Sequence, residues 1–230
     1  MKKVAILQSN YIPWKGYFDL INMVDEFVIY DDVQYTKNDW RNRNKIKTSS
    51  GVQWLTIPVR QETLSQRICD TKISQNNWGV KHWNTLKTNY AKSKYFNFFS
   101  PVFEKLYKDT RSEWLTEVNC AFILTINKIL EIGTTISMSS DYKLSGDKVE
   151  RLVGLCKQAR ATEYISGPSA KKYIHEDIFK DAGIKLTWMD YSNYSEYSQL
   201  YSPFEHGVTI LDLLFNCGSS ATQYMKSFNL

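Results

Sequence analysis

The chain has 230 residues, of which 43% are hydrophobic and 23% charged, and these proportions exclude a disordered or collagen-like chain. Its net charge of +5, from 29 Lys and Arg against 24 Asp and Glu, is too small to indicate a DNA- or RNA-binding protein. No apolar run approaches the roughly 20 residues of a membrane-spanning helix, and the run at the N-terminus is too short for a signal peptide, so we expect no membrane span and a cytoplasmic protein.

The first thirty residues have the pattern of a strand, a helix and a second strand. Residues 3–7 predict an apolar strand that ends at the polar run Gln8-Ser9-Asn10. Pro13, a residue type tolerated at a helix start, opens an amphipathic segment that continues to residue 24. Residues 26–30 are again apolar and stop at Asp31-Asp32. This succession is typical of a parallel α/β sheet.

The middle of the chain is first polar and then aromatic. Residues 34–51 are basic, rich in Asn and without an amphipathic period, so we expect a long functional loop there, with a strand after it at 53–59. Residues 76–107 are rich in aromatic side chains and predict helices in pieces. Apolar residues three and four apart predict an amphipathic helix at 113–132, which Gly133 ends.

The second half of the chain alternates short apolar strands with helices. We expect strands at 134–138, 163–165 and 184–189, and helices at 147–160, 170–182 and 207–214. Ser145 is the expected cap of the helix at 147–160. No repeat or linker divides the chain. The sequence therefore predicts one α/β domain over residues 1–230, with a mostly parallel, Rossmann-like sheet flanked by helices.

The cysteines and histidines do not suggest a metal site. The four cysteines form no CxxC pair, and only three histidines are present. A structural zinc site needs closely spaced ligands, and a cytoplasmic protein rarely keeps disulfides. We therefore expect free thiols and no bound structural metal.

Four polar segments each follow a predicted strand directly. Ligands of open parallel sheets bind beyond the carboxyl ends of the strands, where such segments meet. We therefore expect a ligand site built from segments 8–11, 31–34, 166–169 and 190–191.

The segment 166–169 (Ser-Gly-Pro-Ser) has the composition of an anion-binding turn. Gly167 would allow close backbone approach, and Ser169 would cap the predicted helix that follows. The free N–H groups at a helix start attract anions, and Lys171 and Lys172 stand in the same turn. An ordinary capped turn with surface lysines is the alternative.

Three side chains are candidates for acid or base chemistry. Asp31 and Asp32 could bind a metal or ribose hydroxyls or act as a base, but neighbours on a strand point in opposite directions, so only one would face a given site. A structural turn is the alternative for this pair. His206 is a candidate general base in a loop, or a structural histidine.

The run 40–47 concentrates cations beside an aromatic residue. Its candidate ligand-binding residues are Trp40, Arg41, Asn42, Arg43, Lys45 and Lys47. The planar guanidinium group of Arg donates two parallel hydrogen bonds to phosphate. The run predicts a clamp for a phosphorylated small molecule, with a solvated basic loop or a nucleic-acid contact as the alternatives.

Several long motifs together resemble the WbqC-like family. They are the runs 8–18 (QSNYIPWKGYF), 31–34 (DDVQ), 40–48 (WRNRNKIKT), 164–168 (YISGP) and 209–216 (TILDLLFN) with Gly218. That family is associated with bacterial O-antigen and surface-polysaccharide gene clusters. The resemblance implies a transferase that adds an aminoacyl (such as glycyl) or acyl group to a sugar, and it supplies no assured catalytic residue.

A second similarity is to nucleotidyltransferase-like Rossmann folds. Segment 13–21 is placed like their HxGH stretch, and segment 165–172 is similar to their phosphate-binding ISGTxIR-type motif. Trp14 and Tyr17 stand where that family has its two histidines. The similarity implies nucleotide binding, with a nucleotide and Mg²⁺ as the candidate cofactor, and leaves adenylyl transfer in doubt.

The principal hypothesis is a sugar-modifying transferase acting on a phosphorylated, nucleotide-linked or lipid-linked sugar. Its proposed catalytic residues are Asp31, Asp32 and His206. Its proposed substrate-binding residues are Gln8, Tyr11, Trp14, Lys15, Gly16, Tyr17, Gln34, Trp40, Arg41, Asn42, Arg43, Lys45, Lys47, Ser166, Gly167 and Ser169. The alternatives are an adenylation-type enzyme and a non-catalytic module of a polysaccharide-synthesis complex. Partner proteins of that pathway, or a second copy of the chain, are the candidate associates.

Overall fold

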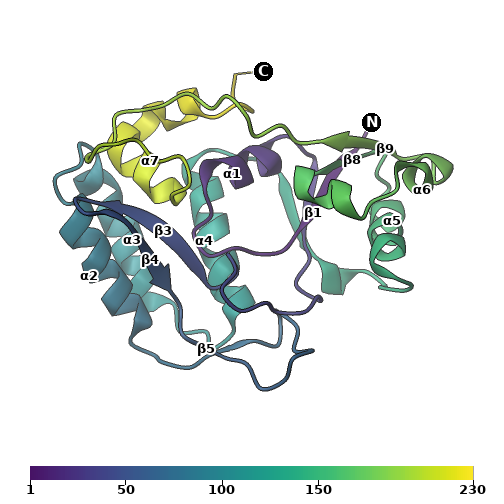
Figure 1. Cartoon of the computed structure of the whole chain (residues 1–230), viewed down its shortest axis with the longest axis horizontal. Helices are drawn as coiled ribbons and strands as arrows, with labels where there is room; N and C mark the ends of the chain where they lie inside the picture. Colours follow the sequence, from purple (N-terminus) through teal and green to yellow (C-terminus); the bar gives the residue numbers. More distant parts are fainter. Residues whose placement is uncertain (230) are drawn as a thin grey trace.

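The computed structural model describes residues 1–229 and has a five-stranded sheet at its centre (Figure 1). The strands, in sheet order, are β7 Thr135–Met138, β2 Glu26–Ile29, β1 Lys3–Leu7, β8 Glu163–Ser166 and β9 Lys185–Trp188. All neighbouring pairs are parallel. Counted along the chain, this order is 3-2-1-4-5, as in the first five strands of dinucleotide-binding sheets. The predicted α/β class and Rossmann-like sheet are confirmed.

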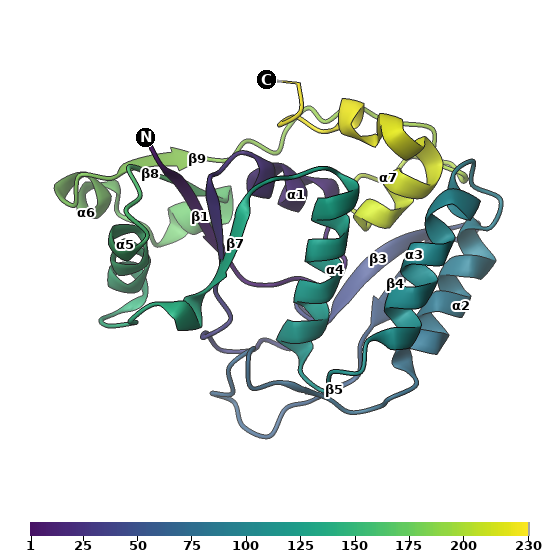
Figure 2. The same ribbon diagram turned by 180° about the vertical axis from the view of Figure 1, so that it is seen from behind.

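Within the described residues the α-helices are α1 Lys15–Asn22, α2 Trp78–Tyr90, α3 Phe96–Asp109, α4 Leu115–Ile129, α5 Lys148–Gln158, α6 Glu176–Asp181 and α7 Ile210–Cys217. Helices α1 and α4 cover one face of the sheet and α5 and α6 the other, while α2 and α3 pack against each other to one side (Figure 2). Ala5 and Phe27 belong to one core with α1 and α4, whereas Val4 and Val28 belong to a second core with α5 and α6 (Figure 2). Since successive residues of a strand alternate between faces, this double cover explains why the strands are apolar throughout.

The prediction of a loop over residues 34–51 is wrong in its second part. Residues 43–48 form the strand β3 Arg43–Thr48, which pairs with β4 Gly51–Thr56 in an antiparallel hairpin. This hairpin belongs to a long insertion between β2 and β7. Asn44 and Ile46 are buried, while Arg43 and Lys45 are partly exposed. The inward face carries an asparagine in place of an apolar residue, which hid the alternation in the sequence. The short strands β5 Val59–Arg60 and β6 Lys72–Ile73, and the helices α2 to α4, complete the insertion.

Three further predictions in the second half are wrong in detail. The expected helix at 170–182 is a 3₁₀ helix at Pro168–Lys172 followed by α6, because Tyr173 to His175 leave the helical conformation. Asp147, and not Ser145, caps α5 by accepting hydrogen bonds from the N–H groups of Val149 and Glu150. A carboxylate at that position reaches two free donors of the first turn at once. The closing helix begins at Ile210, three residues later than predicted.

Candidate functional site

The predicted strand-end segments lie along one edge of the sheet. They follow β2, β1, β8 and β9, which are consecutive neighbours, so parallel pairing brings all four to the carboxyl edge. The strands that follow β1, namely β2 and β7, lie on one side of β1 in the sheet, and the later strands β8 and β9 lie on its other side, so the strand order reverses at β1. Ligands of such sheets bind at this reversal, between the ends of β1 and β8.

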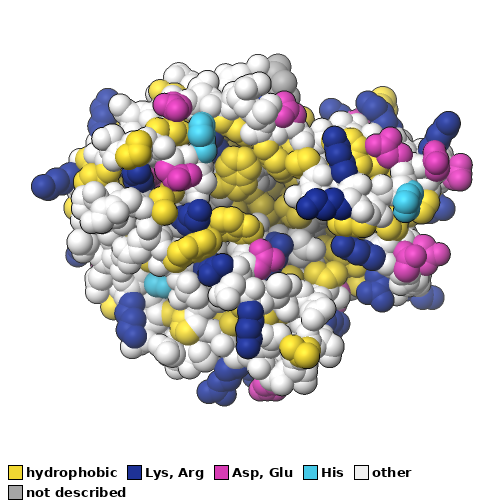
Figure 3. Space-filling model, in the orientation of Figure 1, with side chains coloured by type: hydrophobic (Ala, Val, Ile, Leu, Met, Phe, Trp, Pro, Cys, Tyr) yellow, Lys and Arg dark blue, Asp and Glu magenta, His cyan; other side chains and the backbone are white. Residues whose placement is uncertain are grey.

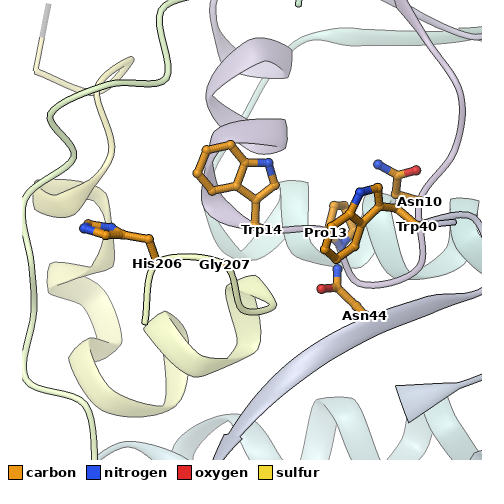
Figure 4. Close-up of a pocket in the computed structure, with 7 residues that line it drawn as sticks. All are labelled: Asn10, Pro13, Trp14, Trp40, Asn44, His206 and Gly207. Carbon is orange, nitrogen blue, oxygen red and sulfur yellow. The ribbon is translucent and has the colours of Figure 1, made fainter. Parts of the chain in front are cut away.

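A cavity of about 280 Å³ is lined by the loop that follows β1, whereas the segments 31–34, 166–169 and 190–191 do not contribute to its lining. Its lining residues are Asn10, Pro13, Trp14, Trp40, Asn44, His206 and Gly207 (Figure 4). They come from the β1–α1 loop, the β3 region and the segment before α7. Trp14 stands between His206 on one side and Pro13 and Trp40 on the other (Figure 4). Figure 3 shows a hollow with a hydrophobic floor and basic side chains around it. We refer to this cavity as the tryptophan pocket.

Asn44 fixes the β1–α1 loop that forms one wall of the tryptophan pocket. Its Nδ2 donates hydrogen bonds to the carbonyl oxygens of Tyr11 (3.0 Å) and Ile12 (2.9 Å). Ile12 has a φ of 36°, in the left-handed region that a β-branched residue rarely adopts. Such strain persists only where neighbouring contacts impose it, and it is concentrated at ligand sites. The asparagine therefore holds an unfavourable backbone conformation at the pocket wall.

The indole of Trp14 is tightly packed between its neighbours. Its ring packs edge-on against Tyr191 and Tyr194, with centroid distances of 5.3 and 5.5 Å. A Cβ added to Gly16 would lie 2.7 Å from Cη2 of Trp14 and closer still to Cζ2. Gly16, predicted to bind substrate, is thus placed under the indole, where only a hydrogen fits.

Two cations form a basic rim beside the tryptophan pocket. Trp40 and Trp54 pack with ring centroids 5.3 Å apart. The Arg43 guanidinium lies 4.1 Å and the Lys45 ammonium 5.3 Å from the Trp54 centroid. Within residues 1–229, neither cation has a carboxylate at ion-pair distance. The rim therefore offers uncompensated positive charge next to an aromatic cavity.

The pocket and its rim lie within a segment that matches a known family. The model of the WbqC-like protein family matches residues 8–224. The chain belongs to the WbqC-like protein family. It is 49% identical over 227 residues to the uncharacterized protein Rv1507c of Mycobacterium tuberculosis, covering 98% of both chains. No solved structure matches this WbqC-like protein.

Three other members of the basic run in this WbqC-like protein hold the loop together. Arg41 donates to Oδ1 of Asn10 and lies 3.6 Å from a carboxylate oxygen of Asp39. Asn42 is buried and donates to the carbonyl oxygen of Ile57 at 2.8 Å. Lys47 is also buried, and its Nζ donates to the carbonyl oxygen of Pro203 at 2.5 Å. Arg43 also donates within the loop, to Oδ1 (3.3 Å) and to the carbonyl oxygen of Asn38, so among the described cations of the run only the Lys45 ammonium has neither a carboxylate nor a hydrogen-bond acceptor.

The two aspartates face different partners, as alternation on an extended chain predicts. Asp31 is buried and accepts hydrogen bonds from Ser9 N (2.8 Å), Ser9 Oγ (2.6 Å) and Thr116 Oγ1 (2.6 Å). Burial raises the pKa of its carboxyl group, and these hydrogen bonds partly offset that increase. Asp32 accepts from Ser139 Oγ at 2.5 Å and pairs with Arg67 at 3.0 Å. Neither aspartate lines the tryptophan pocket.

Several predicted binding residues of the WbqC-like protein are internal. Tyr11 has no exposed surface, and its hydroxyl lies 2.8 Å from His82 Nδ1 and 2.7 Å from the Tyr107 hydroxyl. The Tyr17 hydroxyl donates to the Gln8 carbonyl oxygen at 3.0 Å. Burial removes these hydroxyls from a ligand in solution, so they act in the core.

Lys15 is buried at the start of α1. Its ammonium donates to the Ser195 carbonyl oxygen at 3.0 Å and lies over the rings of Tyr194 and Tyr197. Burial lowers its pKa to about 8. It thereby joins α1 to the segment before α7. Gln34, also predicted to bind substrate, donates to the Leu64 carbonyl oxygen at 2.5 Å, away from the pocket lining.

The anion-binding turn predicted after β8 lacks its helix. Ser166 is buried, and a 3₁₀ helix begins at Pro168, so no α-helix start stands behind Ser169. Gly167 has ordinary φ, and a Cβ there would meet no protein atom within 4 Å, so neither the backbone nor the protein packing requires glycine here. The turn still borders the strand reversal, but the proposed helix dipole is absent from it.

The sequence did not single out three lining residues of the pocket: Pro13, Asn44 and Gly207. Asn10 belonged to the predicted ligand segment 8–11, although it was not named as a binding residue by itself. Gly207 adjoins His206, so proximity in the chain was the available signal. Among the described residues, no group of three or more His, Cys, Asp or Glu side chains is placed to hold a metal ion. Over the same residues, no helix has the length and apolarity to cross a bilayer.

Proposed function

We propose that this WbqC-like protein binds a phosphorylated or nucleotide-linked sugar in the tryptophan pocket and transfers an aminoacyl or acyl group to it. The observation that carries the proposal is an aromatic pocket beside two cations that have no carboxylate partner among the described residues. Indole faces pack on the C–H faces of sugar rings, and amide groups bond sugar hydroxyls. The resemblance to proteins of surface-polysaccharide gene clusters supports a sugar as the substrate.

The size of the pocket fits one ring of such a ligand. Ligand sites for whole drug-sized molecules span about 300–1,000 Å³. At about 280 Å³, the tryptophan pocket can take a single sugar ring, so the carrier would extend outside it. Arg43 and Lys45 at the rim would then bind the phosphate that joins sugar and carrier, because charge-assisted hydrogen bonds to phosphate favour such cations.

His206 is the best-placed candidate base for the transfer. Of the three predicted acid-base residues, it alone lines the pocket. A hydroxyl or amine of the bound sugar would lose its proton to the imidazole as it attacks the acyl carbon, and the donor's leaving group would depart with the bonding electrons. The remaining residues of the pocket would contribute by positioning the sugar. Asp31 and Asp32 take no part in this scheme.

A second candidate is the activation of a carboxylate by ATP, with pyrophosphate leaving. The strand order 3-2-1-4-5 and a pocket lined by the loop that follows β1 favour a nucleotide ligand. The missing α-helix after β8 weighs against the phosphate-binding motif that this candidate requires. ATP–pyrophosphate exchange in the presence of amino acids and Mg²⁺ would support it, and no exchange would remove it.

The test of the principal proposal is titration calorimetry with nucleotide-sugars, the matching nucleotides and the free sugars. Arg43→Ala should weaken binding of a phosphate-linked sugar by about 1.5–3 kcal/mol, or roughly tenfold to 150-fold. The matched control is Arg111→Ala, at an exposed arginine that is remote from the pocket lining. His206→Ala should retain binding and lose transfer. Equal affinities for Arg43→Ala and the wild type would contradict the phosphate assignment. Full transfer by His206→Ala would contradict the assigned base.

A further inference from the structure

The hairpin of α2 and α3, residues 78–111, carries the excess charge of the whole chain. It contains seven Lys and Arg residues and two acidic residues, so its net charge equals the +5 of the entire sequence. All seven cations are exposed: Lys81, Lys87, Lys92, Lys94, Lys105, Lys108 and Arg111. Among the described residues, only Lys108 of these seven has an ion-pair partner, Glu104 at 2.7 Å. This surface therefore has a strong positive potential that the protein leaves uncompensated.

The same surface exposes apolar side chains between the lysines. Phe98 is 74% exposed, Val80 50% and Val102 44%. Phe98 and Val102 are one turn apart on α3, with Lys105 following on the same stripe. The opposite sides of both helices are buried in the aromatic core through Trp83 and Phe103. The exposed stripe is thus an outer face of the molecule, and the hairpin stands at one end of it (Figures 1 and 2).

The apolar surface continues from Phe98 into a neighbouring groove. This groove has a volume of about 610 Å³ and is lined both by apolar side chains, including Phe98, Ile129 and Phe228, and by polar ones, including Asn22 and Glu131. It lies where α3, the end of α4 and the C-terminal segment meet. An exposed phenylalanine beside such a groove and among exposed lysines has the composition of an interfacial membrane-binding surface.

We propose that the α2–α3 hairpin docks on an anionic lipid bilayer. Lysines near such a membrane are attracted by its negative surface potential, and Phe98 would enter the boundary between headgroups and acyl chains. A second copy of the chain does not fit this surface, because a two-fold contact would place the two sets of cations against each other. Six of the seven cations are lysines with apolar neighbours, which fits a lipid surface better than base recognition by arginine. The proposal does not depend on the transfer reaction.

The test is cosedimentation of the full-length protein with lipid vesicles. Vesicles rich in phosphatidylglycerol should bind the protein, and phosphatidylcholine vesicles should not. Because the Debye length falls from about 10 Å at 0.1 M salt to about 3 Å at 1 M, high salt should release most of the bound protein. Equal binding to both vesicle types, or no binding to either, would overturn the proposal. The latter result would leave the proposed sugar site intact, since that site is tested by calorimetry without lipid.

Paired variants assign the binding to this surface. The double variant Lys94→Gln/Lys105→Gln should bind anionic vesicles about 25-fold more weakly, at about fivefold per lysine. The control Lys157→Gln/Lys180→Gln makes the same charge change on α5 and α6 and should bind like the wild type. Phe98→Ser should weaken binding about tenfold, from the loss of apolar burial. Equal losses in the double variant and its control would overturn the assignment. Concentration-dependent dimers that Phe98→Ser abolishes, without vesicle binding, would show self-association and overturn it too.

Discussion

Replacing Gly16 by alanine tests how the pocket wall is built. The new methyl group would lie 2.7 Å from Cη2 and 2.8 Å from Cε2 of Trp14, well inside contact distance. The indole cannot simply turn away, because Tyr191 and Tyr194 pack against it at 5.3 and 5.5 Å between centroids. Gly16→Ala should therefore displace Trp14 and break one or both aromatic contacts.

The magnitude follows from two opposing effects. Each edge-to-face aromatic pair contributes about 0.5–1.5 kcal/mol, so losing both costs about 1–3 kcal/mol. Alanine in place of glycine in a helix returns about 0.5–1 kcal/mol through reduced chain entropy. The net free energy of unfolding should fall by about 0.5–2 kcal/mol. At about 2–4 °C per kcal/mol for a chain of this length, Tm should fall by about 1–8 °C.

Gly154→Ala provides the matched control. Gly154 also lies in a helix, α5, but a Cβ there would meet nothing within 4 Å. That variant should gain about 0.5–1 kcal/mol. Urea unfolding and thermal melts measure both changes, and titration with a nucleotide-sugar should show weaker binding for Gly16→Ala alone. If Gly16→Ala stabilised the protein as much as Gly154→Ala does, the described packing of Trp14 would be refuted.

The remaining predictions concern two residues that hold the core and the loop. Burial lowers the pKa of His82 to about 4, below the usual 6.5, so the unfolded chain takes up its proton first as the pH falls. The free energy of unfolding should fall by about 3 kcal/mol between pH 6.5 and pH 4. In His82→Gln, the free energy obtained from urea unfolding should depend less on pH over that range, and an unchanged slope would contradict this assignment. Asn44→Ala should cost about 2–3 kcal/mol, because two buried carbonyl groups lose their donor. The exposed Asn84→Ala should change stability by less than about 0.5 kcal/mol, and similar losses in both would refute the role of Asn44.

The sheet was predictable because its strands are marked locally. Residues 3–7 and 26–30 are apolar runs ended by polar residues, and they agree with β1 and β2. The strand β3 was missed because its inward positions include Asn44, whose amide is satisfied by carbonyl groups some thirty residues away. The continuous helix expected at 170–182 does not form. Its sequence pattern favours a helix, but residues 173–175 leave the helical conformation and divide it in two. The prediction of one domain for the whole chain stays a prediction.

The candidate site was predictable only in part. The strand-end rule named segment 8–11, whose Asn10 lines the pocket, and the aromatic-basic run supplied Trp40 in the lining and Arg43 and Lys45 beside it; that these residues bind a ligand stays a prediction. The sequence could not separate Lys45 from Arg41 and Lys47, whose partners are distant in the chain, or from Arg43, which donates to Asn38. All four have the same charge and the same local context, so only three-dimensional contacts distinguish an available cation from an occupied one.

The sequence by itself determined the class of the fold, because apolar runs and their polar ends depend on neighbours along the chain. It also determined the family, because long motifs such as residues 40–48 stand in order over most of the chain. Tertiary structure alone decided which polar residues are accessible to a ligand. Asp31 and Tyr11 are residue types that often bind ligands. In this structure both are buried and form hydrogen bonds with distant segments, so they are part of the protein interior. Solvent exposure and hydrogen-bond satisfaction are properties of packed surfaces, so no local pattern contains them.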